Sequence, residues 1–219
     1  MNELDLKKLG VTGVNQALYK LPRNTNERHW VIRNPMGQHA LACGLDAQLH
    51  VEIHGHVGFY CGGMNKEAEI TIHGHAGVGV AENMMSGVVW VKGNASESAG
   101  ATANGGLLVI EGDASSRCGI SMKGIDIVVG GSIGAFSAFM AQAGNLVVCG
   151  DAGENLGDSL YEADIYVRGA VASRRSTHVS ASSYRPLSTS CCAMRRPSSQ
   201  RPSLAIVRVF TSTQRTRAI

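Results

Sequence analysis

The sequence HVEIHGHVGFYCGGMNKEA, residues 50–68, is followed directly by EITIHGHAGVGVAENMMSG, residues 69–87, and the two segments align without a gap. Each segment has 19 residues and contains HGH, then Val or Ala, then glycine. The first glycine of this motif returns at the same interval along the chain, at Gly55, Gly74, Gly93, Gly112, Gly131, Gly150 and Gly169. A period this strict predicts one supersecondary unit stacked on copies of itself.

The residues before these seven glycines, termed the anchor glycines, alternate in character. The positions two and four before each anchor are aliphatic, as in Ile53 and Val51, which predicts a half-buried strand. Nineteen residues at about 3.3 Å each make a loop of roughly 60 Å, which we expect to fold into a three-sided coil. The predicted fold is therefore all-β, a single-stranded parallel β-helix of about seven 19-residue coils. Leucine-rich repeats are excluded because LxxLxL is absent, and hexapeptide coils because 19 is not a multiple of six.

Further glycines recur three and seven residues after the anchors. Where glycine is missing, Ala81, Ser96, Ser115 and Ala138 replace it, and all four are small. We interpret these glycines as structural turn positions, where the chain reaches conformations that other residues avoid. The predicted turn set is Gly55, Gly58, Gly62, Gly74, Gly77, Gly93, Gly100, Gly112, Gly119, Gly131, Gly134, Gly150, Gly153, Gly157 and Gly169.

The pattern divides the chain into three parts. Residues 1–29 are expected to form an N-terminal cap or arm, with a helical pattern over residues 4–20 and Thr12 as a candidate N-cap. Residues 30–173 form the β-helix, beginning with a degenerate first coil at Trp30. Residues 174–219 form a C-terminal tail. Because terminal repeats are usually atypical, the N-terminal part is expected to cover the first exposed edge of the array.

The tail differs sharply from the rest of the chain in composition. All 27 glycines and all 17 acidic residues precede Arg174, whereas residues 174–219 contain nine Arg and no acid. The net charge is therefore −6 for residues 1–173 and +9 for the tail. Such a composition predicts an irregular, disordered segment. We interpret it as out of frame with the ancestral gene, since the change falls in the middle of a coil. An Arg-rich nucleic-acid arm is the alternative, but no nucleic-acid partner is expected.

The chain has no apolar run near the roughly 18 residues that a membrane helix needs. Its first residues, MNELDLKKLG, include acids and lack the apolar core of a secretory signal. We therefore expect no membrane association and a cytoplasmic location.

The two HGH motifs form the sharpest candidate site. Because the period is 19, His54 is expected to stack on His73 and His56 on His75, about 4.8 Å apart in adjacent coils. Four imidazoles in one patch could hold a transition metal. The simpler interpretation is that they flank the turn glycine and face solvent. No nearby carboxylate or cysteine is expected to complete a ligand set, so no metal site is assigned.

The segment VVGGSIGAF, residues 128–136, resembles a phosphate-binding glycine loop after a strand. A dinucleotide fold would require a helix next and an acidic residue roughly 20 residues later. Here the glycines coincide with the turn positions of the repeat, which favours a structural role. No Ser/His/Asp or Cys/His arrangement stands out, so no catalytic and no cofactor-binding residue is predicted.

The spacing G-x-x-G-x-x-x-G, complete at Gly55-Gly58-Gly62 and Gly150-Gly153-Gly157, resembles the C-terminal GXGXG domain of the glutamate synthase large subunit. The connecting segments strengthen the resemblance, namely GLDA at 44–47, GMNK at 63–66, AENMMSG at 81–87, GGLLVIEGDASSRCGISMKG at 105–124 and AFMAQAGNLVV at 138–148. They are similar to the stand-alone form of that domain, a subunit of glutamate-synthase-like or N-methylglutamate-synthase-like enzymes. The resemblance covers roughly residues 10–173.

The resemblance implies a right-handed β-helix without a cofactor, acting as a scaffold subunit of an amino-acid oxidoreductase complex. Its implied partners are an amidotransferase-like subunit and a subunit bearing FMN and an iron–sulfur cluster. Two alternatives remain open: a structural assembly module without an enzyme partner, and the β-helical subunit of a formylmethanofuran-dehydrogenase-like complex.

Overall fold

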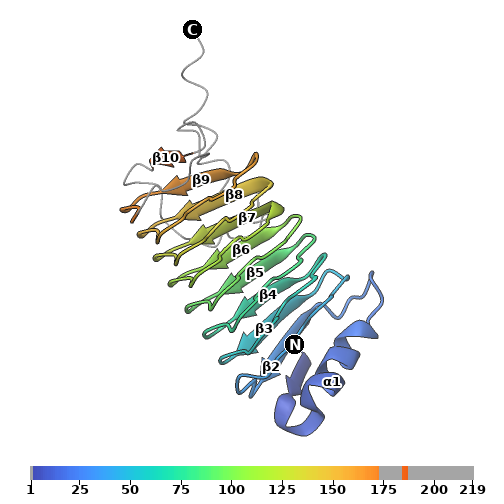
Figure 1. Cartoon of the computed structure of the whole chain (residues 1–219). Coiled ribbons are helices and arrows are strands. Elements are labelled where there is room, and N and C mark those ends of the chain that lie inside the picture. Colours follow the sequence, from blue (N-terminus) through green and yellow to red (C-terminus); the bar gives the residue numbers. More distant parts are fainter. Residues whose placement is uncertain (1, 173–183, 187–219) are drawn as a thin grey trace.

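The computed structural model describes residues 2–172 and 184–186, which form one parallel sheet and one helix. Strands neighbouring in sequence are also neighbours in the sheet, so the chain returns to the same side after each strand (Figure 1). The elements are β1 (Asn2–Asp5), α1 (Leu6–Tyr19), β2 (His29–Arg33), β3 (His50–His54), β4 (Glu69–Ile72), β5 (Val88–Val91), β6 (Leu107–Ile110), β7 (Lys123–Val129), β8 (Ala143–Val148), β9 (Asp164–Val167) and β10 (Tyr184–Pro186). This arrangement is a parallel β-helix and confirms the predicted fold class.

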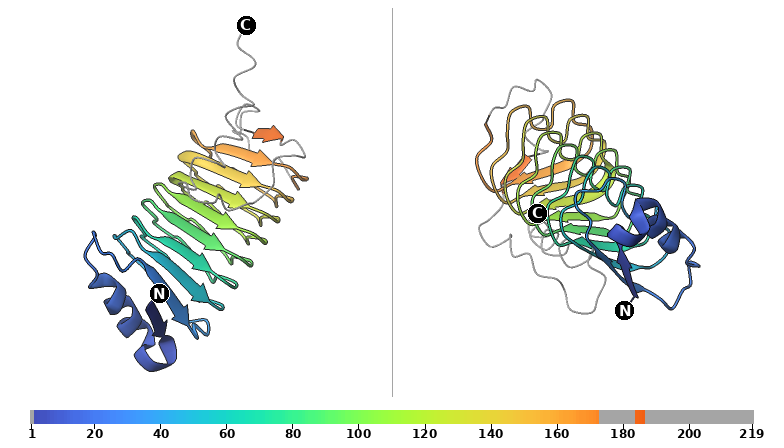
Figure 2. Two further views of the ribbon diagram at one scale, coloured as in Figure 1. Left: turned by 180° about the vertical axis from the view of Figure 1, so that it is seen from behind. Right: turned by 90° about the horizontal axis from the view of Figure 1, so that it is seen from below.

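The register of the sheet follows the sequence period. From β3 to β9, paired residues are 19 apart, as in Val51 with Ile70 and Ile70 with Val89. The exception is Lys123 with Ala143, 20 residues apart, where the register between β7 and β8 shifts. The first connections are longer, since Asn2 pairs with Trp30 and His29 with His50. The stack of coils is seen from behind and from below in Figure 2.

The core lies inside the coils. The aliphatic side chains two and four residues before each anchor are buried, and Ile53, Ile72 and Ile110 are 0% exposed. A second inward column stands two residues after the anchors, where single parallel bridges connect Val57 to Ala76 and onward to Val171. Like residues therefore stack on like, as the period predicted.

The anchor glycines are required for a different reason than predicted. We expected a turn conformation, but among the seven only Gly55 has a positive φ, at 140°. The others lie directly against the preceding coil. A Cβ on Gly74 would lie 2.5 Å from the carbonyl oxygen of Gly55, and one on Gly93 would lie 2.5 Å from Nδ1 of His75. Close stacking of the coils, rather than backbone freedom, selects glycine here.

Left-handed backbone is found five, seven and nine residues after the anchors. At the seventh position, Gly119 has a φ of 68°, and Ala81 and Ala138 adopt the same conformation at 57° and 54°. Because these residues alternate with others, the chain turns there instead of forming a strand. Only one side of each coil is a continuous strand, and the remaining sides are held by bonds such as Gly119 N–H to Ala99 O at 2.8 Å.

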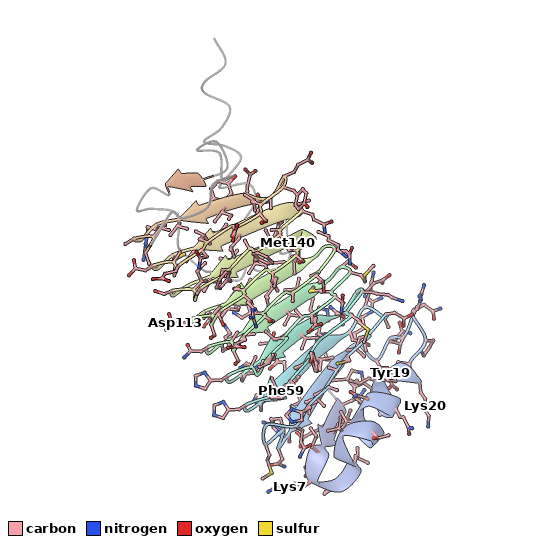
Figure 3. The ribbon with its side chains drawn as sticks, in the orientation of Figure 1. Lys7, Tyr19, Lys20, Phe59, Asp113 and Met140 are labelled. Carbon is pink, nitrogen blue, oxygen red and sulfur yellow. The ribbon has the colours of Figure 1, made fainter. Side chains whose placement is uncertain are left out.

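Helix α1 closes the N-terminal end of the core (Figures 1 and 2). Its N-cap is Asp5, which accepts the backbone N–H of Lys7 at 2.9 Å, and not Thr12 as predicted. Thr12 follows a break at Gly10, where φ is 62° and ψ is 175°. Figure 3 labels Lys7 and Tyr19 at the two ends of the helix. Within residues 2–172 and 184–186, α1 is too short and too polar to form a transmembrane segment.

Side chains attach this helix to the first coil. The amide of Asn15 donates to the carbonyl of Ala40 at 2.8 Å and accepts the N–H of Ala42 at 2.9 Å. The hydroxyl of Tyr19 donates to the carbonyl of Cys43 at 2.7 Å. The N-terminal part also contributes β1 to the sheet, which the sequence pattern did not predict.

The 19-residue register continues into the segment interpreted as an irregular tail. Tyr184, Arg185 and Pro186 pair with Ile165, Tyr166 and Val167, each 19 residues earlier. These three residues are the part of the predicted tail that the structure describes. The rest of residues 174–219 lies outside the described part of the chain.

Candidate functional site

Three columns of side chains line the outer face of the sheet, at the positions one, three and five residues before the anchors. They alternate with the inward positions along each strand. In the first coils these columns are polar and rich in histidine and glutamate, whereas from β5 onward the middle column is apolar. The face therefore has two chemically different halves.

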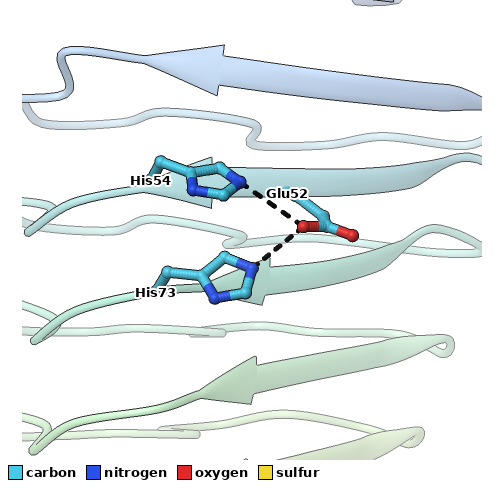
Figure 4. A group of neighbouring side chains, drawn as sticks. All are labelled: Glu52, His54 and His73. Atoms are coloured by element: carbon cyan, nitrogen blue, oxygen red, sulfur yellow. Dashed lines mark hydrogen bonds and ion pairs between the residues drawn. The ribbon is translucent and has the colours of Figure 1, made fainter. Parts of the chain in front are cut away.

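Glu52, His54 and His73 form a compact cluster in the polar half (Figure 4). One carboxylate oxygen of Glu52, Oε2, lies 3.4 Å from Nε2 of His54 and 3.0 Å from Nε2 of His73. The two imidazole rings are stacked with centroids 4.5 Å apart, as predicted. The expectation that no carboxylate completes the set is wrong. Glu52 precedes His54 by two residues and therefore shares its face of the strand.

The electrostatics of Glu52 favour its charged form. Partial burial raises the pKa of this carboxyl, but the hydrogen bond from His73 and the nearby imidazoles of His73 and His54 outweigh it. The pKa of Glu52 therefore lies below its ordinary value of 4.5. A second acid–histidine pair flanks the cluster, since Nδ1 of His50 lies 3.0 Å from Oε2 of Glu69.

The other two histidines of the predicted patch have a structural role. The rings of His56 and His75 are also stacked, 4.9 Å apart, but their Nδ1 atoms accept backbone N–H groups of the following coil. Equivalent residues continue this bonding along the whole β-helix, and we name the series the acceptor ladder: His56, His75, Asn94, Asp113, Ser132 and Asp151. The prediction of one patch of four imidazoles thus gives way to a Glu52 cluster and a separate backbone ladder. Figure 3 labels Asp113 on the ladder.

The glycine segment at residues 128–136 is part of the repeat. Gly131 and Gly134 lie between β7 and β8, and the chain continues through turns into β8 instead of entering a helix. Neither glycine has a positive φ, and a Cβ on Gly134 would lie 2.5 Å from the backbone nitrogen of Ser116, so close stacking on the preceding coil requires them.

The middle outer column becomes apolar after Thr71. Trp90, Val109, Val128, Val147 and Tyr166 occupy successive strands and, with Val88 and Leu107, form a hydrophobic cluster separate from the core. Trp90 is 3% exposed and Val109 0%. These outward-facing side chains are thus buried. Sequence reasoning missed it, although the runs VVWV and LLVI carry the signal, since strands buried on both faces are apolar without alternation.

A groove of about 640 Å³ lies at the beginning of the strands. Its lining mixes charges of both signs, including Arg28, Lys66, Glu69 and Asp126, with glycines such as Gly87 and Gly106. Because both cations and carboxylates line the groove, it favours neither anionic nor cationic ligands.

Large apolar side chains are exposed on the turns five to nine residues after the anchors, away from the sheet. Tyr60, Met64, Phe136 and Met140, termed the turn-side residues, are 48%, 54%, 41% and 40% exposed. All four have a positive φ, between 52° and 61°. In other coils the same two positions hold small or polar residues: Gly79, Ser98, Arg117 and Asn155 at the fifth, and Asn83, Thr102, Ser121 and Ser159 at the ninth. The fold alone does not require bulky apolar groups there.

A segment of 65 residues, 30% of this chain, is 56% identical to Protein GlxC of Rhizobium meliloti (strain 1021). The match covers 28% of that protein, so this chain corresponds to less than a third of the relative's length. No family model matches the chain. No solved structure matches it significantly.

Proposed function

We propose that this chain is a non-catalytic scaffold subunit of a glutamate-synthase-like, or N-methylglutamate-synthase-like, amino-acid oxidoreductase complex. The glycines whose spacing resembles the GXGXG domain lie in stacked coils of the structure. The similarity of a 65-residue segment to Protein GlxC supports the proposal. In this proposal an amidotransferase-like subunit supplies nitrogen, and a subunit with FMN and an iron–sulfur cluster carries out the redox chemistry.

The observation that carries the scaffold role is the set of turn-side residues. A bulky residue in left-handed backbone is strained, and such strain persists only where the structure or the function maintains it. Phe136 and Met140 keep this conformation with 41% and 40% of their surface exposed, where Ser98 and Ser121 satisfy the same turns. Exposed aromatic and methionine side chains are typical of protein interfaces. We assign them to partner contact.

A pulldown from the native source with the full chain as bait tests the proposal. Partners with an FMN absorbance spectrum and an amidotransferase-like sequence are expected, identified by mass spectrometry. Replacing Phe136 and Met140 by serine should weaken their retention more than 10-fold, because each buried apolar side chain contributes about 1.5–3 kcal/mol. Ser121→Asn, which copies Asn83 at the equivalent turn position, is the matched control.

Two results would contradict the proposal. A bait that recovers only non-enzymatic partners would favour the structural assembly module. Equal retention by the double serine variant and the control would remove the turn-side residues from the interface.

A further inference from the structure

We propose that Glu52, His54 and His73 form a binding site for a divalent transition-metal ion, with Zn²⁺ as the ion that best fits the ligand set. Two imidazole nitrogens and one carboxylate oxygen are a known zinc-binding combination, with the fourth position open to water. The three ligand atoms of Glu52, His54 and His73 all lie within 4.8 Å of one another. Within the described residues, no other group of three metal-ligating side chains is this compact.

The distances between ligand atoms are close to those that a metal imposes. In a tetrahedral site with bonds of about 2.0–2.1 Å, neighbouring ligand atoms are separated by about 3.3–3.4 Å. Glu52 Oε2 is already 3.4 Å from His54 Nε2 and 3.0 Å from His73 Nε2. The nitrogen–nitrogen separation is at most 4.8 Å, and the two rings are stacked with 23° between their planes. Binding therefore requires both rings to tilt until their Nε2 lone pairs point at one ion.

The backbone beneath the cluster is fixed by pairing and packing. Strands β3 and β4 pair in parallel through Ile53 and Ile72, which point into the core and are 0% exposed. Glu52 and His54 therefore project from β3, and His73 from the residue after β4, whose N–H donates to the carbonyl of Ile53 at 2.8 Å. The spacing of these two segments cannot change without disturbing the core. The metal would link adjacent coils, since His73 comes from the coil after that of Glu52 and His54.

The site is open to solvent on its outer side. The side chains of Glu52, His54 and His73 are 41%, 36% and 36% exposed, so an ion can enter without local unfolding. The Nε2 atoms of both histidines face the carboxylate, as Figure 4 shows. By contrast, His56 and His75 use Nδ1 to accept backbone N–H groups, which provides an internal comparison between a ligand pair and a structural pair.

Zinc titration of the full untagged chain by isothermal calorimetry tests the proposal. One Zn²⁺ per chain is expected to bind, and His73→Ala and Glu52→Gln should each weaken binding at least about 100-fold, because losing even an outer-shell partner costs about 10–100-fold. His75→Asn is the matched control, since Asn94 accepts the same backbone bond one coil later. It should bind Zn²⁺ like the unmodified chain. Far-UV circular dichroism of each variant monitors the fold.

The visible spectrum of bound Co²⁺ gives a second measurement, because tetrahedral coordination by nitrogen and oxygen produces d–d absorption that His73→Ala should abolish. The proposal is overturned if the unmodified chain binds no Zn²⁺. It is equally overturned if folded His73→Ala keeps the same affinity, or if His75→Asn loses as much affinity as His73→Ala. None of these results depends on the proposed scaffold function.

Discussion

Replacing Gly112 by alanine should destabilise the fold through one identifiable contact. A Cβ at Gly112 would lie far inside van der Waals distance of Asn94 Oδ1 and 3.0 Å from the carbonyl oxygen of Gly93. Asn94 Oδ1 accepts the N–H of Asp113 at 3.0 Å, so the amide must leave this bond to make room. The substitution therefore breaks one rung of the acceptor ladder and tightens the contact between two coils.

The expected loss of stability is about 2 kcal/mol, within a range of about 0.5–4 kcal/mol. The lost hydrogen bond contributes about 0.5–1.5 kcal/mol, and forcing a methyl group into a packed contact costs about 1–3 kcal/mol. Replacing glycine also lowers the conformational entropy of the unfolded chain, which stabilises the folded state by about 0.4–1 kcal/mol. The measurement is the free energy of unfolding in urea, followed by far-UV circular dichroism.

A double-mutant cycle with Asn94→Ala identifies the cause. Asn94→Ala alone should cost about 0.5–1.5 kcal/mol, the value of its hydrogen bond. Once the Asn94 amide is gone, Gly112→Ala should cost about 1–2 kcal/mol less, which is a coupling that only contacting residues show. Additive effects, within about 0.5 kcal/mol, would refute the close-approach explanation.

Gly119→Ala is the comparison substitution, because Gly119 has left-handed backbone and makes no close contact with the backbone of the preceding coil. Its φ is 68°, and an added Cβ would find its nearest atoms at 3.2 and 3.3 Å. Left-handed backbone costs a non-glycine residue roughly 1–2 kcal/mol. No coupling with Asn94→Ala is expected for this variant.

Three further predictions concern other parts of the chain. Ile110→Ala should lower the free energy of unfolding in urea by about 2–5 kcal/mol, because the side chain is 0% exposed and would leave a cavity. Burial raises the pKa of the Cys118 thiol to about 12. Iodoacetamide should therefore label Cys118 only after unfolding, and stoichiometric labelling of Cys118 in the native chain would contradict this. The pKa of Asp5 lies below its ordinary value of 3.8, chiefly through the hydrogen bond from Asn34 and then that from Lys7 N–H. This stabilisation is present above pH 3.8 and is lost as the pH falls through the lower folded pKa. When the urea midpoint of unfolding is plotted against pH, Asp5→Asn should therefore lose less of its midpoint at acid pH than the unmodified chain.

The strand positions and the stacking of coils were predictable from the sequence. Alternation such as Val51, Ile53 and then Gly55 is a local signal, and equal spacing converts residues 19 apart into neighbours in space. The stacked histidine pairs follow from the same arithmetic, and both were found.

The part that was missed involves contacts that the period does not express. Glu52 reaches His73 diagonally, from three residues before one anchor to one residue before the next, whereas the 19-residue period aligns only equivalent positions. The role of Gly112 depends on its contact with the Asn94 side chain of the previous coil. That contact follows from the three-dimensional stacking of the coils and not from the local sequence. The N-cap was misplaced because Asp5 both ends a strand and begins the helix.

The strict period also limits which side chains can occupy a column. Two unit charges of the same sign stacked about 4.8 Å apart repel by roughly 0.9 kcal/mol in water and roughly 3.5 kcal/mol at an effective dielectric constant of 20. Aliphatic columns can repeat through every coil, but charged residues in the described coils meet an opposite or neutral neighbour, as Lys92 meets Glu111 and Asp113 meets Ser132.

Histidine is the ionisable residue that this face does repeat, at His29 with His50 and at His54 with His73. A neutral imidazole stacks without repulsion and keeps a nitrogen lone pair available. A column position that repeats histidine therefore tolerates the stacking and at the same time brings two metal ligands together. Where a carboxylate on the same strand faces that pair, as Glu52 does, the repeat itself produces a three-ligand set without any change in the fold.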